Sequence, residues 1–158
     1  MSRTFSKVGV VGLGTMGAGI VEVFARNGLQ VVGVEIDDEA VARGRGHLEA
    51  STSRAVKRGK LSQPDMDQRL AQITGSLQMA DVKNADMVIE AVFEDMGLKQ
   101  DIFRQLDAHC KPGAILATNT SGLNVDAIAA VTSRPQDVVG AHFFSPAHVM
   151  KLLEVVRG

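Results

Sequence analysis

The sequence has no tryptophan, no tyrosine and only one cysteine among its 158 residues. Without those aromatic rings, a surface that stacks nucleic-acid bases is not expected. The lone Cys110 cannot form a disulfide within the chain, which fits a reducing compartment. The net charge is only −1, so the composition does not favour binding to nucleic acid or to a membrane surface.

Long apolar runs are also missing from the chain. No stretch of about 18 apolar residues occurs, so no membrane-spanning helix is expected. Six residues precede the first expected strand, and we expect no signal peptide there. The length is that of about one domain. Together these features predict a cytoplasmic protein with a single domain over residues 1–158.

The sequence does contain a strand–glycine–helix pattern at residues 8–20, which read VGVVGLGTMGAGI. Gly12, Gly14 and Gly17 have the G-x-G-x-x-G spacing, between an apolar run and a helical pattern. We expect Gly12 to permit a tight turn, Gly14 to leave room for a pyrophosphate, and Gly17 to let the helix lie close to its strand. The N–H groups and positive dipole end of that helix favour phosphate. The pattern therefore predicts dinucleotide binding.

A second apolar run, residues 31–35, ends in Glu35, 18 residues after Gly17. In a dinucleotide-binding fold, this position faces the adenine ribose, and a carboxylate there accepts hydrogen bonds from both hydroxyls. The same charge repels a 2′-phosphate, and no arginine or lysine follows before Arg43. The sequence therefore favours NAD over NADP as the cofactor.

The rest of the chain alternates between helical and strand patterns. This alternation predicts an α/β fold with a doubly wound, mostly parallel Rossmann-type sheet and a helical insertion after the second strand. The expected helices cover residues 15–26, 38–60, 62–71, 97–109 and 125–131, and the expected later strands cover 73–77, 87–92, 114–118, 138–144 and 152–156.

A second informative segment runs from His142 to Glu154 and reads HFFSPAHVMKLLE. Pro146 turns the chain, so a returning strand could bring Glu154 back to His142. Oxidation of an alcohol requires a proton acceptor, and histidine has a pKa near neutrality. A neighbouring carboxylate would orient the imidazole. The alternative is a strand-end histidine that bonds only to backbone.

Four segments together resemble the NAD-binding domain of the 3-hydroxyacyl-CoA dehydrogenase family: VGVVGLGTMGAGI, EAVFEDMGLK, ATNTSGL and GAHFFSPAHVMKLLEVV. The resemblance covers nearly the whole chain. It implies oxidation of an L-3-hydroxyacyl-CoA to the 3-ketoacyl-CoA, with NAD as hydride acceptor, in fatty acid β-oxidation or a related acyl-CoA pathway. It also implies that His142 is the catalytic histidine, Glu154 its carboxylate partner, and Ser121 the serine beside the substrate oxygen and the nicotinamide.

The resemblance assigns further residues to ligand binding, and no metal site is predicted. Two positions on the long helix, Ser51 and Arg58, align with residues that meet the CoA phosphates and adenine. From the residues alone, the basic part of this helix is better explained as a solvated face than as a site for an anionic substrate. The positions predicted to bind the cofactor are Gly12, Leu13, Gly14, Thr15, Met16, Gly17, Glu35, Val92, Phe93, Glu94, Lys99, Asn119, Ser121 and Ser145.

The sequence departs from the family pattern in three places. Glu35 replaces an aspartate, and Ser145 replaces an asparagine, a change more typical of relatives fused to a hydratase. The family's C-terminal all-helical domain is missing from this chain, so we expect the domain to bind NAD with little turnover, while a full-length protein would be a homodimer. Two alternatives stay open: a β-hydroxyacid dehydrogenase of the 6-phosphogluconate or 3-hydroxyisobutyrate type, because of GLGTMG, and a non-catalytic dinucleotide-binding module.

Overall fold

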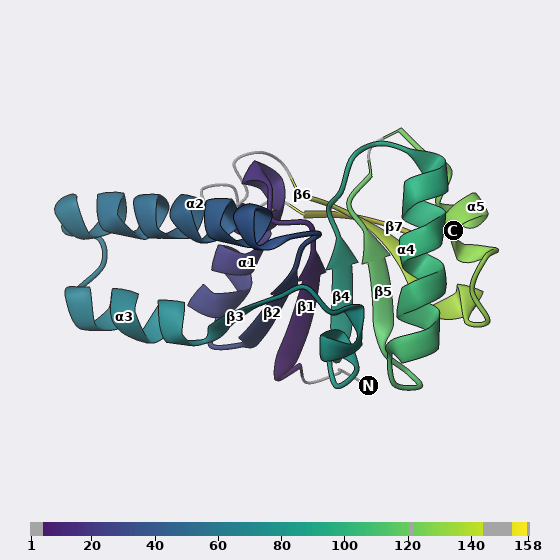
Figure 1. Ribbon diagram of the computed structural model, residues 1–158, viewed down its shortest axis with the longest axis horizontal. Helices are drawn as coiled ribbons and strands as arrows, with labels where there is room; N and C mark the ends of the chain where they lie inside the picture. Colours follow the sequence, from purple (N-terminus) through teal and green to yellow (C-terminus); the bar gives the residue numbers. More distant parts are fainter. Residues whose placement is uncertain (1–4, 121, 144–152, 158) are drawn as a thin grey trace.

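A computed structural model describes residues 5–120, 122–143 and 153–157. In this part of the chain, seven strands form one sheet in the order β3-β2-β1-β4-β5-β6-β7 (Figure 1). Six strands run parallel and β7 is antiparallel to β6. The predicted doubly wound sheet is therefore confirmed. The strands are β1 (Lys7–Val11), β2 (Gln30–Val34), β3 (Ile73–Ser76), β4 (Met87–Glu90), β5 (Ile115–Thr118), β6 (Val138–Phe143) and β7 (Leu153–Arg157).

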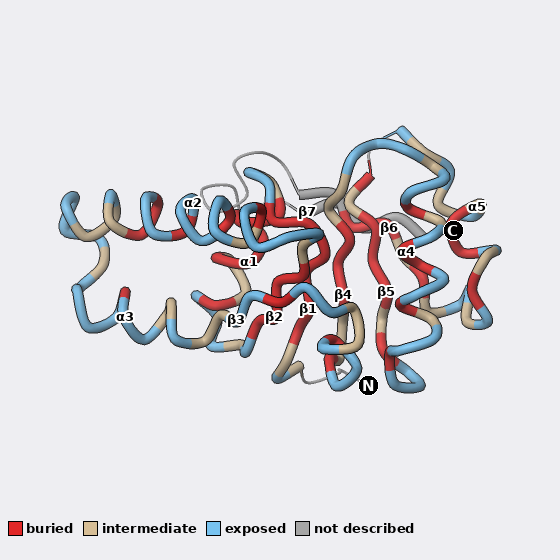
Figure 2. Tube along the Cα trace, in the orientation of Figure 1, coloured by how far each residue is buried: buried red, intermediate tan, exposed pale blue. Residues whose placement is uncertain are grey.

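Helices cover both faces of the sheet. Ile20 of α1 (Thr15–Arg26) belongs to the same buried cluster as Val10, while the next strand residue, Val11, belongs to a second cluster with Phe103 of α4 (Met96–His109). The short α5 (Val125–Ala129) adds Ile128 to this second cluster. Because parallel strands are buried on both sides, they read as continuous apolar runs rather than as alternating ones. Figure 2 shows β1, β2, β4 and β5 as mostly buried.

Two helices, α2 (Asp38–Lys57) and α3 (Gln63–Ala71), form the predicted insertion between β2 and β3. They lie side by side and extend away from the sheet at the left of Figure 1. Asp37 caps α2 by accepting from the Ala40 N–H at 2.8 Å, and Ser62 caps α3 by accepting from the Asp65 N–H at 3.2 Å. These side chains satisfy N–H groups that a helix leaves unpaired at its start.

Several predicted boundaries differ from the observed ones by a few residues. The helix α2 ends at Lys57 rather than at residue 60, because Gly59 turns the chain with a φ of 72°. The strand β4 ends at Glu90 rather than at residue 92, because the Val92 N–H donates to the Glu90 side chain. The sequence did not predict two short 3-10 helices, η1 (Met79–Val82) and η2 (Pro135–Asp137).

No helix in the described ranges is both long enough and apolar enough to cross a membrane.

The C-terminal end of α4 is held in place by Arg134. This side chain donates to the Asp107 carboxylate at 3.0 Å and to the backbone carbonyls of Asp107, Cys110 and Lys111 at 2.7–3.1 Å. A cation at this position satisfies carbonyl groups that the helix leaves unpaired and opposes the negative end of its dipole.

Cys110, at the C-terminal cap of α4, is only 6% exposed. Burial raises the pKa of the Cys110 thiol to about 11. At pH 8 the native thiol should therefore react with iodoacetamide about a hundredfold more slowly, or slower still, than the thiol of the chain unfolded in urea, because only the thiolate is nucleophilic. Mass spectrometry of the labelled fraction over time measures both rates, and equal rates would contradict the observed burial.

Candidate active site

The glycine loop follows β1 and leads directly into α1. Gly12 has a φ of 98°, and a Cβ atom there would lie 2.8 Å from the Ala91 carbonyl oxygen. A Cβ atom at Gly17 would lie 1.8 Å from the Gly12 carbonyl oxygen, so only glycine permits this close approach of helix to strand. Both predicted roles are confirmed. A Cβ atom at Gly14 would meet no atom within 4 Å, so this position faces the open space in which a pyrophosphate would fit.

The first turn of α1 is suited to an anion. It includes Thr15, which is exposed, and Met16, which is half-buried, and it carries no acidic side chain. The first N–H groups of a helix have no partner within it, and the dipole adds positive potential at this end. A phosphate at this position would therefore meet N–H donors without a competing carboxylate.

Glu35 follows β2 directly and lies beside this loop. Its Oε2 accepts from the Leu13 N–H at 2.8 Å, and its Oε1 accepts from the Ile36 N–H at 3.0 Å. These bonds hold the carboxylate at the carboxyl edge of the sheet, where the predicted ribose contact requires it. Leu13 is also a predicted cofactor contact, but its N–H is used by Glu35 and its side chain is only 5% exposed.

Two large apolar side chains are exposed at the same edge. Ile36 follows β2 and is 87% exposed, and Phe93 follows β4 and is 84% exposed. The strands β2 and β4 are the two neighbours of β1, so these side chains flank the glycine loop. Exposed apolar groups next to a binding loop are typical of a ligand surface. Sequence reasoning missed Ile36, although an apolar residue directly after the acidic one is a usable signal.

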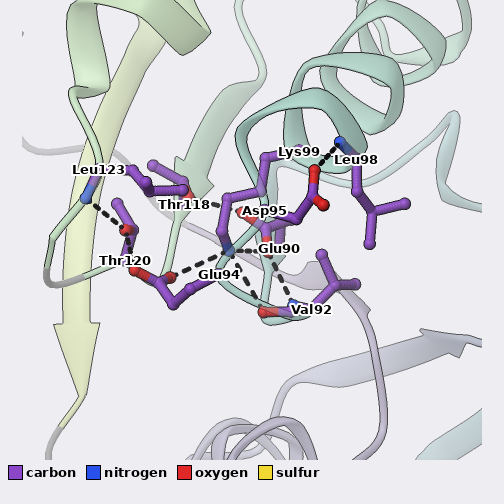
Figure 3. A network of polar contacts seen from close by, with 9 residues as sticks. All are labelled: Glu90, Val92, Glu94, Asp95, Leu98, Lys99, Thr118, Thr120 and Leu123. Carbon is purple, nitrogen blue, oxygen red and sulfur yellow. Dashed lines mark hydrogen bonds and ion pairs between the residues drawn. The ribbon is translucent and has the colours of Figure 1, made fainter.

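A buried polar network lies where β4 and β5 end (Figure 3). The Glu90 carboxylate accepts from the Lys99 ammonium at 2.5 Å, from the Val92 N–H at 2.7 Å and from the Thr118 hydroxyl at 2.6 Å. Glu90, Lys99 and Thr118 have no exposed surface. The Lys99 ammonium also donates to the Val92 carbonyl at 3.3 Å and lies 3.5 Å from Glu94 Oε1. One cation is therefore shared by two carboxylates.

Glu94 is the accessible end of this network, with 45% of its side chain exposed. It accepts from the Thr120 hydroxyl at 2.7 Å, and that hydroxyl accepts from the Leu123 N–H at 3.1 Å. Burial alone would raise the pKa of Glu94, but the Thr120 hydrogen bond and the Lys99 charge outweigh it, so the pKa lies below its ordinary value. Of the predicted cofactor contacts Glu94 and Lys99, only Glu94 reaches the surface.

Sequence reasoning did not assign a role to Glu90, Thr118 or Thr120. The available signal was the charged residue in the apolar run MVIEAV, because a charge in a buried strand requires a partner. The partner lies nine residues further along the chain, on a helix, and the sequence does not indicate this pairing. The backbone strengthens the same junction, where the Asn119 N–H donates to the Glu90 carbonyl at 2.8 Å.

The predicted catalytic pair lies on β6 and β7. His142 and Glu154 are direct partners in the register of this antiparallel strand pair. The register places these two backbone positions opposite each other, so the expected returning strand is confirmed in its topology. Ser121 and Ser145 lie outside the described residues, and their predicted roles stay predictions.

The predicted CoA contacts lie on α2. The Ser51 hydroxyl donates to Glu22 of α1 at 2.9 Å, and both residues are buried at a small cavity of about 70 Å³ between the two helices. Arg58 is exposed at the C-terminal cap of α2. Their contact with CoA stays a prediction. Over the described ranges, no group of three or more histidine, cysteine or acidic side chains is arranged to hold a metal ion.

A parallel sheet with a glycine loop after β1 and a carboxylate after β2 defines a dinucleotide-binding α/β domain. Comparison with known proteins identifies the family. A model described as 3-hydroxyacyl-CoA dehydrogenase, NAD binding domain, matches residues 7–158. The chain therefore belongs to the 3-hydroxyacyl-CoA dehydrogenase family and carries its NAD-binding domain. The match favours this assignment over the β-hydroxyacid dehydrogenase alternative.

Named relatives agree with this assignment. The chain is 51% identical over 156 residues to a peroxisomal bifunctional enzyme of Danio rerio, covering 99% of this chain and 21% of the relative. It is 42% identical to a 3-hydroxybutyryl-CoA dehydrogenase of Mycobacterium tuberculosis, covering 99% of this chain and 55% of the relative. The crystal structure of (S)-3-hydroxybutyryl-CoA dehydrogenase from Ralstonia eutropha superposes with a TM-score of 0.96 at 43% identity, covering 98% of this chain and 55% of that one. The chain thus spans about a fifth to a half of these relatives' lengths.

Substitutions of Gly14 and Gly17 should affect different properties, NADH binding and stability respectively. We expect Gly14→Ala to fold with a stability within about 1 kcal/mol of the parent, because its new methyl group meets no protein atom, but to lose NADH affinity at least about tenfold. Gly17→Ala should destabilise the fold by about 3 kcal/mol or more, because its methyl group collides with the Gly12 carbonyl. Urea unfolding and NADH fluorescence titration measure the two effects. Normal NADH binding by Gly14→Ala would contradict the pyrophosphate position.

The Glu94 carboxylate should respond to the loss of its donor. We expect Thr120→Val to raise the pKa of Glu94, while Thr120→Ser keeps it low. Because the folded pKa is depressed, this hydrogen bond stabilises the fold above the unfolded pKa, and that stabilisation is lost as the pH falls through the folded value. Carbon-13 NMR of the Glu94 carboxyl group gives the pKa directly. An unchanged titration in Thr120→Val would contradict the assigned cause.

Proposed function

We propose that this chain is the NAD-binding part of an enzyme that oxidises L-3-hydroxyacyl-CoA to 3-ketoacyl-CoA. The single observation that supports this reaction best is the pairing of His142 with Glu154 near the carboxyl end of β6. Ligands of open α/β sheets bind at that edge, which also carries the glycine loop. A module that only bound dinucleotides would not need a proton acceptor there.

The NAD site is built from residues that the structure describes. The first turn of α1 would hold the pyrophosphate over Gly14, and Glu35 would accept from the adenine ribose. The exposed side chains of Ile36 and Phe93 would cover the adenine ring. Glu94 would accept from the second ribose. When bound, NAD supplies the acceptor for the hydride that leaves C3 of the substrate.

His142 would perform the acid–base chemistry. As the C3–H bond breaks, a ring nitrogen of His142 takes the proton of the C3 hydroxyl, and the C–O bond becomes a carbonyl group. Glu154 would bond to the other ring nitrogen, fix the tautomer and stabilise the imidazolium that forms. Ser121 would lie beside the substrate oxygen, and Asn119, two residues before it in the sequence, would contact the cofactor. Because the alcohol loses one hydride and one proton, the reaction balances as a two-electron oxidation.

The substrate assignment includes its CoA portion. Arg58, at the exposed end of α2, would attract the CoA phosphates, with Ser51 nearby. The relatives extend beyond the matched segment, and we propose that a helical domain, in cis or in trans, completes the acyl cleft and forms a homodimer. Without it, remote binding energy is lost and water is not excluded, so turnover would be low.

The location of the protein is part of the same proposal. The single, buried Cys110 fits the reducing cytoplasm. The alternative is the peroxisome, because the Danio rerio relative is named a peroxisomal enzyme. Fluorescence microscopy of the tagged natural protein would distinguish the two locations.

A substitution of the histidine tests the proposed chemistry. In the enzyme that contains this domain, His142→Gln should lower the turnover of acetoacetyl-CoA with NADH by roughly 10²–10⁴-fold, because the acid–base group is lost. The dissociation constant of NADH should stay within about twofold, since the substitution leaves the proposed dinucleotide contacts intact.

The matched control is His109→Gln, at the exposed end of α4 and outside the proposed site. It should turn over substrate like the parent. An active His142→Gln enzyme would exclude the proposed role of the histidine, and a chain that fails to bind NADH would contradict the cofactor assignment itself.

A further inference from the structure

Glu90 is a buried carboxylate that the proposed reaction does not use. It ends β4, and its hydrogen-bond donors come from three separate places (Figure 3): Lys99 on α4, Val92 in the loop after β4, and Thr118 at the end of β5. A buried charge is stable only when it is paired and hydrogen-bonded, and Glu90 meets both conditions. With no exposed surface, it cannot contact a ligand directly.

Glu90 determines where the only cation of this network lies. The Lys99 ammonium is 2.5 Å from Glu90 and 3.5 Å from Glu94. The Lys99 ammonium therefore interacts more strongly with Glu90 than with Glu94, since the Coulomb interaction weakens with distance. As a result, Lys99 does not form its closest ion pair with Glu94, and the partly exposed Glu94 carboxylate stays available to accept a hydrogen bond. Without the charge on Glu90, Lys99 would pair with Glu94 alone.

The same residue connects two loops at the carboxyl edge. Its side chain accepts from Thr118 and its carbonyl accepts from the Asn119 N–H, so the start of the loop after β5 is held against β4. The next residue, Thr120, donates to Glu94 on the other loop. Glu90 and Glu94 together therefore join residues 92–95 to residues 118–120.

We propose that Glu90 is a positioning residue for the dinucleotide. By binding Lys99 and Thr118, it keeps the Glu94 carboxylate available to accept from a sugar hydroxyl and keeps the 118–120 loop in place beside it. This inference rests on the proposed function, because it assumes that NAD occupies the edge where Glu94 is exposed. The role of Glu90 is indirect, through Lys99, Glu94 and the loop.

Two substitutions of Thr118 test the inference with little change in volume. Thr118→Val removes the hydroxyl that donates to Glu90, and Thr118→Ser retains it. We expect Thr118→Val to weaken NADH binding about tenfold, the effect of losing one hydrogen bond to a charged group, and Thr118→Ser to bind within about twofold of the parent. Fluorescence titration of NADH with this chain, well below the unfolding temperature of each variant, gives the dissociation constants.

Glu90→Gln tests the charge itself. The amide has nearly the same shape, but it leaves Glu94 as the only carboxylate beside Lys99. We expect NADH affinity to fall at least about tenfold. If this variant does not fold, the comparison of Thr118→Val with Thr118→Ser decides the question.

Asp86→Asn is the control, because it removes one charge of another carboxylate–lysine pair, a more exposed one, at the opposite end of the same strand. Asp86 lies just before β4, and its carboxylate accepts from Lys111 at 2.6 Å. This variant should unfold at a lower temperature but bind NADH like the parent. Normal binding by Thr118→Val, or equally weak binding by Asp86→Asn, would overturn the inference. A parent chain that does not bind NADH would overturn the proposed function as well. If the parent chain binds NADH normally, only the proposed role of Glu90 is contradicted.

Discussion

The contact between the Gly17 backbone and the Gly12 carbonyl is the constraint on which the rest of the structure depends. It brings α1 onto β1 at the point where the strand ends, with no room for a single methyl group. That approach directs the first turn of α1 toward the carboxyl edge and leaves Gly14 facing open space. The anion-binding end of the helix, the Glu35 carboxylate and the exposed apolar side chains then lie around one point.

Charge is arranged at this edge in two different ways. Glu35 is bonded by backbone N–H groups, so its position depends only on the conformation of the two loops that meet there. Glu90 and Glu94 share a lysine that comes from a helix, so their position depends on how α4 packs against the sheet. A buried ion pair of this kind adds little net stability, but removing one partner is costly, since it leaves an unpaired charge. The network therefore favours one arrangement of the two loops over others.

Local chemistry could be predicted from the sequence because it depends on neighbours along the chain. The helix start at Thr15, the caps Asp37 and Ser62, and the turn at Gly12 each follow from side chains within a few residues. The doubly wound, mostly parallel class of sheet also followed, since alternating strands and helices allow few topologies. The exact ends of the elements were less predictable. The strand β4 stops at Glu90 because the Val92 N–H donates to the Glu90 side chain rather than to a neighbouring strand, and no local pattern indicates that bond.

The sequence by itself determined the class of fold and the cofactor-binding loop, because these depend on short patterns with fixed spacing. It also indicated His142 and Glu154 as candidate residues, through the resemblance of whole segments to one family. Tertiary structure alone decided which distant groups meet. It placed Lys99 beneath Glu94 rather than at the surface, joined Thr118 to Glu90, and set His142 opposite Glu154 in the strand register. The physical reason is that a buried charge or an unpaired strand edge requires a partner, and the packing of the whole sheet selects which one is within reach.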